Sequence, residues 1–146
     1  MMLVKLLSDQ VARNWEEIKV AIKRSAPVVE GESPEKYNNI LERMLIGKMD
    51  CWLSYNEEKV MDTLITTYVI EDEIGGTRSL MIYSVTGIGP VSLKSWIEGI
   101  KTLKDYGKSL GCNRLMAYSC NEFILKIAEK NGGDSSWHLV TIPTEL

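Results

Sequence analysis

Apolar residues in the first fifty positions of the chain recur every three or four residues, which is the spacing of one helical face. The first apolar stripe consists of Val11, Trp15, Ile18 and Ile22. The second consists of Tyr37, Ile40, Leu41, Met44 and Leu45. Pro27 ends the first pattern, and Ser33 with Pro34 can begin the second, because these residue types favour the end and the start of a helix. This part of the chain therefore predicts two helices, preceded by a short apolar strand at 2–7.

The pattern changes at about residue 50, where β-branched and aromatic residues become frequent. Three strands are predicted, at 50–55, 59–70 and 78–86. A polar turn at 56–58 separates the first two, and a turn containing Gly75 and Gly76 separates the last two. Links as short as these join antiparallel strands, so we expect a meander.

The helical period returns at residue 93 and predicts a long helix that Gly111 ends. A strand at 113–119, a short helix capped by Asn121 and a last strand at 136–142 complete the chain. The order β-α-α-β-β-β-α-β-α-β predicts a mixed α/β fold in a single domain, 1–146. We expect a mixed, mostly antiparallel sheet with helices on both faces. The strands that contain Tyr83 and Leu115 should be adjacent and parallel, and should diverge after about residue 84.

The same periodicity predicts the side chains that form the core. They are Trp15, Ile18, Leu41, Leu45, Leu64, Ile82, Ile97, Ile100, Leu115, Ile124 and Ile127.

The composition excludes several classes of protein. Seventeen basic and twenty acidic residues give a net charge of -3, which offers no general attraction to nucleic acid or an anionic membrane. Three dispersed cysteines form neither a disulfide framework nor a zinc site, and we expect no bound metal. No apolar run approaches the roughly 18 residues of a membrane span. These features are typical of a cytoplasmic protein.

The segment NEFILKIAEKNGG at 121–133 carries a more specific signal than the order of elements. Asn121, Glu129, Lys130 and Gly132 keep the spacing of the pattern N-x-x-A-I-x-L-Y-E-K-x-G-F. Together with the order of elements, this segment resembles the Gcn5-related N-acetyltransferase (GNAT) family. The resemblance implies a GNAT-like domain over nearly the whole chain, and an acetyl-CoA site where the long helix begins.

The start of the long helix departs from the family pattern Q/R-x-x-G-x-G/A, whose backbone N–H groups hold the coenzyme A pyrophosphate. That motif falls near Val91, Lys94 and Trp96, and none of the three fits it. The sequence Gly87-Ile88-Gly89-Pro90 could be a shifted phosphate loop, although Pro90 removes one donor and glycine–proline pairs are common in turns. The cofactor-binding candidates are Gly87, Gly89, Ser92 and Asn121.

The catalytic positions implied by the resemblance are also altered. Ala128 stands where the family often has the tyrosine that protonates the leaving thiolate, and alanine cannot donate a proton. Tyr118 is a candidate substitute, and Glu71 is a candidate general base. A nucleophile pair between His138 and Cys112 or Cys120 has no supporting motif.

Three functions remain open at this point. The first is an interaction or virion-assembly protein on a degenerate GNAT scaffold without a cofactor, because the chain resembles short acetyltransferase-like proteins of tailed bacteriophages. It would bind a protein partner, in the host cytoplasm or the virion, and could form an oligomer. The second is an active acetyl-CoA-dependent N-acetyltransferase, and the third is a small-ligand-binding module. Fold resemblance does not decide among them.

Overall fold

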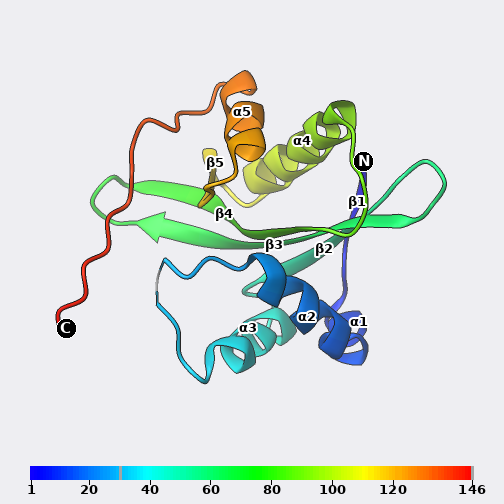
Figure 1. Cartoon of the computed structure of the whole chain (residues 1–146), viewed down its shortest axis with the longest axis horizontal. Coiled ribbons are helices and arrows are strands. Elements are labelled where there is room, and N and C mark those ends of the chain that lie inside the picture. The colour runs from blue at the N-terminus through cyan, green and yellow to red at the C-terminus, as the bar shows by residue number, and fades with distance from the viewer. Residues whose placement is uncertain (30, 146) are drawn as a thin grey trace.

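A five-stranded sheet separates two layers of helices in the computed structural model, which describes residues 1–29 and 31–145 (Figure 1). Residues 30 and 146 of the predicted domain lie outside the described residues. The elements in chain order are β1 (Met2–Lys5), α1 (Ser8–Arg13), α2 (Trp15–Ser25), α3 (Lys36–Leu45), β2 (Asp50–Tyr55), β3 (Met61–Asp72), β4 (Thr77–Gly87), α4 (Leu93–Ser109), β5 (Arg114–Ala117) and α5 (Glu122–Lys130).

The strands lie side by side in chain order, from β1 to β5. The first three pairings are antiparallel, and β5 pairs in parallel with β4. Leu80 lies opposite Leu115, so the predicted parallel neighbours are confirmed. The crossover through α4 makes β4 and β5 parallel, because a helix returns the chain to the edge at which β4 began.

The two helical layers cover opposite faces of the sheet, as the order of elements predicted (Figure 1). Helices α1, α2 and α3 cover one face, where the buried residues are Val11, Ile18, Ile22, Ile40, Met44, Met49, Cys51 and Leu64. Helix α4 covers the other face, where the buried residues are Trp52, Ile65, Leu80, Leu103 and Cys112. The central strand β3 contributes to both faces, and six consecutive residues of it, 62–67, are buried.

The first predicted helix is two short helices in the structure. Asn14 separates them, with a backbone conformation of φ −112° and ψ 19°. Its side-chain amide donates a hydrogen bond to the Gln10 carbonyl at 2.8 Å. Asparagine competes in this way for backbone groups that would otherwise continue the helix.

The predicted strand at 136–142 is wrong, because no strand forms among the described residues after α5. A strand needs a neighbour that accepts and donates its backbone hydrogen bonds. The segment runs away from the sheet instead, and the Trp137 side chain is 88% exposed (Figure 1).

Two of the predicted core residues are exposed, namely Leu45 at 42% and Ile97 at 44%. The face of α4 that packs on the sheet carries Gly99, Leu103 and Gly107. Ile97 lies about 120° around the helix from Leu103, since each residue turns the helix by about 100°. A methyl group on Gly107 would lie 3.6 Å from the Cβ atoms of Leu80 and Cys112, so this glycine sets the close approach of the helix.

Replacing Leu103 by alanine should lower the free energy of unfolding by about 2–5 kcal/mol, because the side chain is 2% exposed and leaves a cavity. The matched change Ile97→Ala should cost less than about 1 kcal/mol, since surface substitutions have small effects. Urea titrations followed by circular dichroism measure both values. Equal losses would contradict the orientation of α4 described above.

Candidate functional site

The pairing between the strands β4 and β5 ends halfway along β4. Their ladder ends at Ile82 and Ala117, close to the predicted point. On the other side of β4, Thr67 pairs with Ile82 and Thr66 pairs with Ser84, so Tyr83 is one extra residue in the register of β4 with β3. Such a bulge bends a strand and re-aims it. The bulge at Tyr83 therefore turns β4 away from β5, and the sheet divides at this point.

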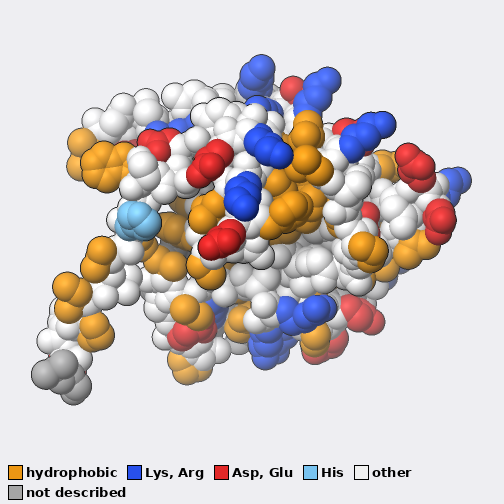
Figure 2. All heavy atoms as spheres, turned by 45° about the horizontal axis from the view of Figure 1, so that its top comes forward, with side chains coloured by type: hydrophobic (Ala, Val, Ile, Leu, Met, Phe, Trp, Pro, Cys, Tyr) orange, Lys and Arg blue, Asp and Glu red, His pale blue; other side chains and the backbone are white. Residues whose placement is uncertain are grey.

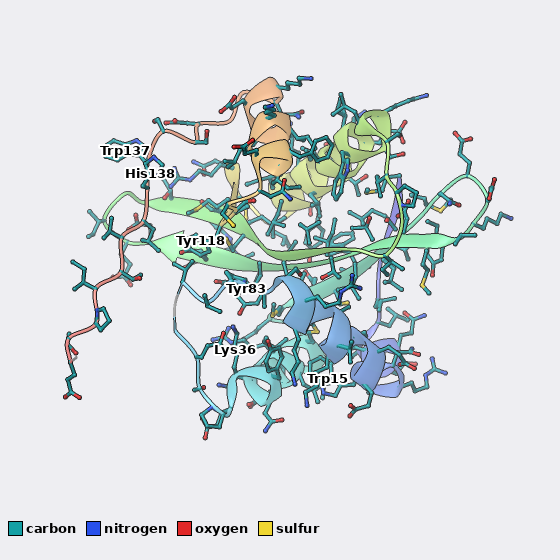
Figure 3. The ribbon with its side chains drawn as sticks, viewed as in Figure 1. Trp15, Lys36, Tyr83, Tyr118, Trp137 and His138 are labelled. Carbon is teal, nitrogen blue, oxygen red and sulfur yellow. The ribbon has the colours of Figure 1, made fainter. Side chains whose placement is uncertain are left out.

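A charged cluster lies at the bulge, on the face covered by α3. The Lys36 ammonium donates to the Pro27 carbonyl at 3.0 Å and to Glu32 Oε1 at 2.5 Å, and it also bonds to Tyr83. The Tyr83 ring lies 6.0 Å from the ring of Tyr68. Figure 3 labels Lys36 and Tyr83 beside the start of α3 and the middle of the sheet.

The Lys36 side chain is only 11% exposed. Burial favours the neutral amine, but the hydrogen bonds to Glu32 and Tyr83 outweigh it and raise the pKa of Lys36 above its ordinary value. Lys36 is therefore a fixed cation that ties the preceding loop to α3. Sequence reasoning missed this residue, although Glu32 four positions before it was an available signal.

The loop after β4 is bonded back to β3. The N–H groups of Ile88 and Gly89 both donate to the Asp62 carbonyl, at 2.7 and 3.1 Å. Asp62 is itself an extra residue in the pairing of β3 with β2, and its carboxylate accepts a hydrogen bond from the Ser54 hydroxyl. Pro90 follows and has no N–H. Residues 88 to 90 therefore offer no free donor to a ligand.

The N-terminus of α4 is capped by the side chain of the residue that precedes it, Ser92. The Ser92 hydroxyl accepts from the Ser95 N–H at 3.2 Å, so this candidate has a structural role. The described residues supply no acceptor for the N–H groups of Leu93 and Lys94. Trp96 is half-buried in the first turn of the helix.

Gly87 and Gly89 are not required by the packing of the chain. A methyl group on either would meet no atom within 4 Å, and neither has a left-handed backbone. The space beside the loop is open, while the loop's own amides are bonded to β3.

The remaining site candidates lie in different places. Tyr118 is half-buried just beyond the end of β5 (Figure 3). Asn121 uses its side-chain oxygen to cap α5, accepting from the N–H groups of Phe123 and Ile124 at 2.9 and 3.3 Å. Ala128 is on the exposed side of α5. Tyr118 thus follows the end of the paired part of β5, and Asn121 begins α5.

Glu71 lies at the other end of the sheet. It pairs across the hairpin with Arg78, whose guanidinium binds its carboxylate at 2.7 Å. Gly87 pairs with Thr63, eight residues earlier in β3, which is about 26 Å away along an extended strand. The structure thus does not bring Glu71 together with Tyr118 or the glycine loop.

The cysteines and the histidine form no nucleophile pair. Cys51 and Cys112 are buried, Cys120 is exposed, and His138 lies in the exposed segment after α5. Within residues 1–29 and 31–145, no group of three His, Cys, Asp or Glu side chains could hold a metal ion. None of the helices in these ranges is long and apolar enough to cross a membrane.

The fold is shared with solved acetyltransferases. A probable acetyltransferase superposes with a TM-score of 0.68 at 14% identity, over 99% of both chains. The ribosomal-protein-alanine N-acetyltransferase of Brucella melitensis biovar Abortus 2308 gives 0.65 at 10% identity, over 98% of this chain and 99% of its own. AAC(6')-Iy in complex with the bisubstrate analog CoA-S-monomethyl-acetylneamine gives 0.70 at 10% identity, over 99% and 97%.

No protein-family model and no curated protein matches the sequence. The structural neighbours show that the chain has the fold of the GNAT acetyltransferases, as the resemblance predicted. At such low identity they carry no information about substrate or catalysis.

Among the three thiols, only Cys120 should react rapidly with Ellman's reagent near pH 8. Burial, assisted by the negative charge of Asp50, raises the pKa of Cys51 to about 12, so its reactive thiolate is scarce. Cys112 is 7% exposed and sterically protected. The variant Cys120→Ser should lose the fast phase in stopped-flow absorbance, and a fast phase that persists in it would contradict this burial pattern.

Proposed function

We propose that this chain is an acetyltransferase-fold protein that works through protein contacts and does not transfer acetyl groups from acetyl-CoA. The observation that carries the proposal is the double hydrogen bond from Ile88 and Gly89 to the Asp62 carbonyl. It occupies the donors of the only glycine-bearing stretch between β4 and α4.

A pyrophosphate is held by several N–H groups that converge on its oxygens. To supply them, residues 88 and 89 would have to give up two hydrogen bonds to β3, each worth about 0.5–1.5 kcal/mol. Pro90 adds no donor, and the bulky Trp96 stands where the family has a small residue. Without this anchor the acyl group is not positioned, and positioning supplies a large part of the rate of such a transfer.

The proton-transfer groups support the same proposal. Ala128 has no proton to give to a leaving thiolate, and Glu71 lies at the opposite end of the β3–β4 ladder from Gly87. Tyr118 would be left to act alone. A site without a base and without a phosphate anchor is more simply explained as an unused part of the scaffold.

The resemblance to short acetyltransferase-like proteins of tailed bacteriophages suggests the class of partner. We expect a protein of the virion or of its assembly. Several large apolar side chains on the surface support a protein contact, including Trp137 and Phe123, since exposed aromatic residues often anchor interfaces.

The alternative is an active acetyl-CoA-dependent N-acetyltransferase. Two observations favour it: the open space beside Gly87 and Gly89, and the N–H groups of Leu93 and Lys94, for which the described residues supply no acceptor. A phosphate bound there would use the helix start in place of the loop. Binding measurements separate the two functions directly.

Purified protein with 1 mM acetyl-CoA should show no saturable heat in calorimetry and no rise in melting temperature. A ligand with a Kd of about 1 μM would add roughly 4 kcal/mol of stability at that concentration, which is easily detected. An acetyltransferase with a known coenzyme A site serves as the positive control in the same buffer.

The double variant Gly87→Ala, Gly89→Ala shows whether any observed acetyl-CoA binding uses the glycine loop. Both positions have room for a methyl group, so the variant should fold as the parent does. Saturable acetyl-CoA binding by the parent would overturn the proposal, and acetyl transfer would establish the enzyme. Loss of binding in the variant would place the site beside the loop, and retained binding would place it at the start of α4.

A further inference from the structure

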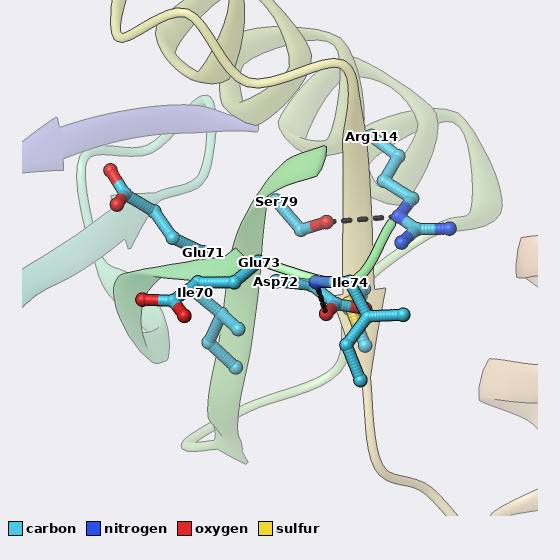
Figure 4. A pocket seen from close by; sticks show the side chains of 8 residues that line it. Ile70, Glu71, Asp72, Glu73, Ile74, Ser79 and Arg114 are labelled. Carbon is cyan, nitrogen blue, oxygen red and sulfur yellow. Dashed lines mark hydrogen bonds between the residues drawn. The ribbon is translucent and has the colours of Figure 1, made fainter. Parts of the chain in front are cut away.

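The end of the sheet near the β3–β4 turn carries an open hollow that the proposed function does not use. Its volume is about 490 Å³, which is within the range of small-ligand sites. The lining side chains come from the end of β3, the turn, β4 and β5 (Figure 4). No residue after α5 lines the hollow, and Figure 2 shows the last described residues extending away from the body.

The hollow is distinct from the region in which the family pattern places a pyrophosphate. Ser79, near the start of β4, lines the hollow, whereas Gly87 ends the same strand and leads to α4. The two regions therefore lie at opposite ends of β4. A ligand in the hollow would not touch the glycine loop or the start of α4.

Arg114 is the cation of the hollow, and the sheet fixes its position. Its Nε donates to Ser79 Oγ at 2.9 Å, and its Nη2 donates to Thr77 Oγ1 at 3.1 Å. Ser79 is 2% exposed and lies opposite Arg114 in the parallel ladder. Both acceptors are neutral, and none of the salt bridges among the described residues includes Arg114. A guanidinium held in this way can bind a carboxylate through its remaining N–H groups.

A carboxylate lies on the same face of the sheet. Asp72 pairs with Thr77, so its side chain is on the side that carries the hydroxyl bonded to Arg114. A Cβ on Gly75 would lie 3.5 Å from both Asp72 Oδ2 and Thr77 Oγ1, which places these two oxygens around one point. Asp72 Oδ1 accepts from the Ile74 N–H at 3.0 Å, while Oδ2 has no donor among the described residues. The hollow therefore presents a cation and an anion that are not bonded to each other.

Apolar side chains complete the hollow. Ile70 pairs with Ser79 and so shares the face of Arg114, and Met116 lies two residues after Arg114 on the same side of β5. Ile74, in the turn, is 100% exposed although it lines the hollow. A ligand with an apolar part would remove these side chains from water, which is favourable.

We propose that the hollow binds a free α-amino acid with an aliphatic side chain. Arg114 would hold the carboxylate, Asp72 would accept from the ammonium, and Ile70 and Ile74 would contact the side chain. One carbon atom separates the two charges of an α-amino acid, so both can reach protein groups that lie on one face of the sheet. This inference goes beyond the proposed function, and it does not depend on whether the chain binds coenzyme A.

Titration calorimetry of the full chain with L-leucine tests the proposal. We expect saturable heat from one site per chain, with a Kd below about 1 mM. Three analogues each lack one recognised part: glycine lacks the side chain, leucine methyl ester the carboxylate, and N-acetylleucine the ammonium. Each should bind at least roughly tenfold more weakly, because it leaves a protein group without its partner. These comparisons use the parent protein and need no variant.

Two variants locate the binding. Arg114→Gln should raise the Kd for leucine at least roughly tenfold, since the charged contact to the carboxylate is lost. The matched control Arg13→Gln changes an arginine that is 71% exposed in α1 and should leave the Kd unchanged. Asp72→Asn keeps an acceptor for the Ile74 N–H and should remove the preference for leucine over N-acetylleucine. Circular dichroism melting checks that each variant is folded.

Three results would overturn the proposal. The first is the absence of saturable heat from the parent protein with leucine at tens of millimolar. The second is an analogue without carboxylate or without ammonium that binds as tightly as leucine. The third is leucine binding that folded Arg114→Gln and Asp72→Asn variants leave unchanged, because it would place the amino acid outside the hollow.

Discussion

The bulge at Tyr83 is the constraint on which the rest of this structure depends. Strand β4 must follow antiparallel β3 over its whole length, but it follows parallel β5 only as far as Ile82. One extra residue resolves the conflict by bending β4 at that point. The bend divides the sheet, and Tyr83 at the bend bonds to the half-buried ammonium of Lys36.

Buried hydroxyl groups hold the second half of β4 in its bent course. Ser84 bonds to Thr66 at 2.6 Å, and Thr86 bonds to Ser25 at 2.5 Å and to the Ala21 carbonyl at 2.7 Å. Each bond satisfies a polar group that would be costly to bury alone. These contacts join β4 to β3 and α2 beyond the point at which the sheet divides.

The two ends of the sheet therefore differ in what they offer. At the end where α4 begins, the N–H groups of Ile88 and Gly89 are bonded to Asp62, while the glycines leave space beside the loop. At the end near the β3–β4 turn, β5 is short, its edge is open and a hollow lies beside it. The first arrangement lies where the long helix of the shared acetyltransferase fold begins, and the second follows from the short β5 of this chain.

The sequence by itself determined the fold, the parallel pair of strands and the order of elements as far as α5, apart from the break at Asn14, because periodicity, caps and glycine stops are local signals. Pro90 and Trp96 can also be read as departures from the family's phosphate-binding pattern, and the loss of coenzyme A binding stays a prediction. Tertiary structure alone decided the rest. The Asp62 carbonyl accepts hydrogen bonds from the loop amides at the bulge in β3. Helix α4 packs Gly107 against Leu80 and leaves Ile97 exposed. Residues 136–142 do not form a strand. Each of these outcomes depends on partners distant in sequence, and a local pattern contains no information about which partner is present.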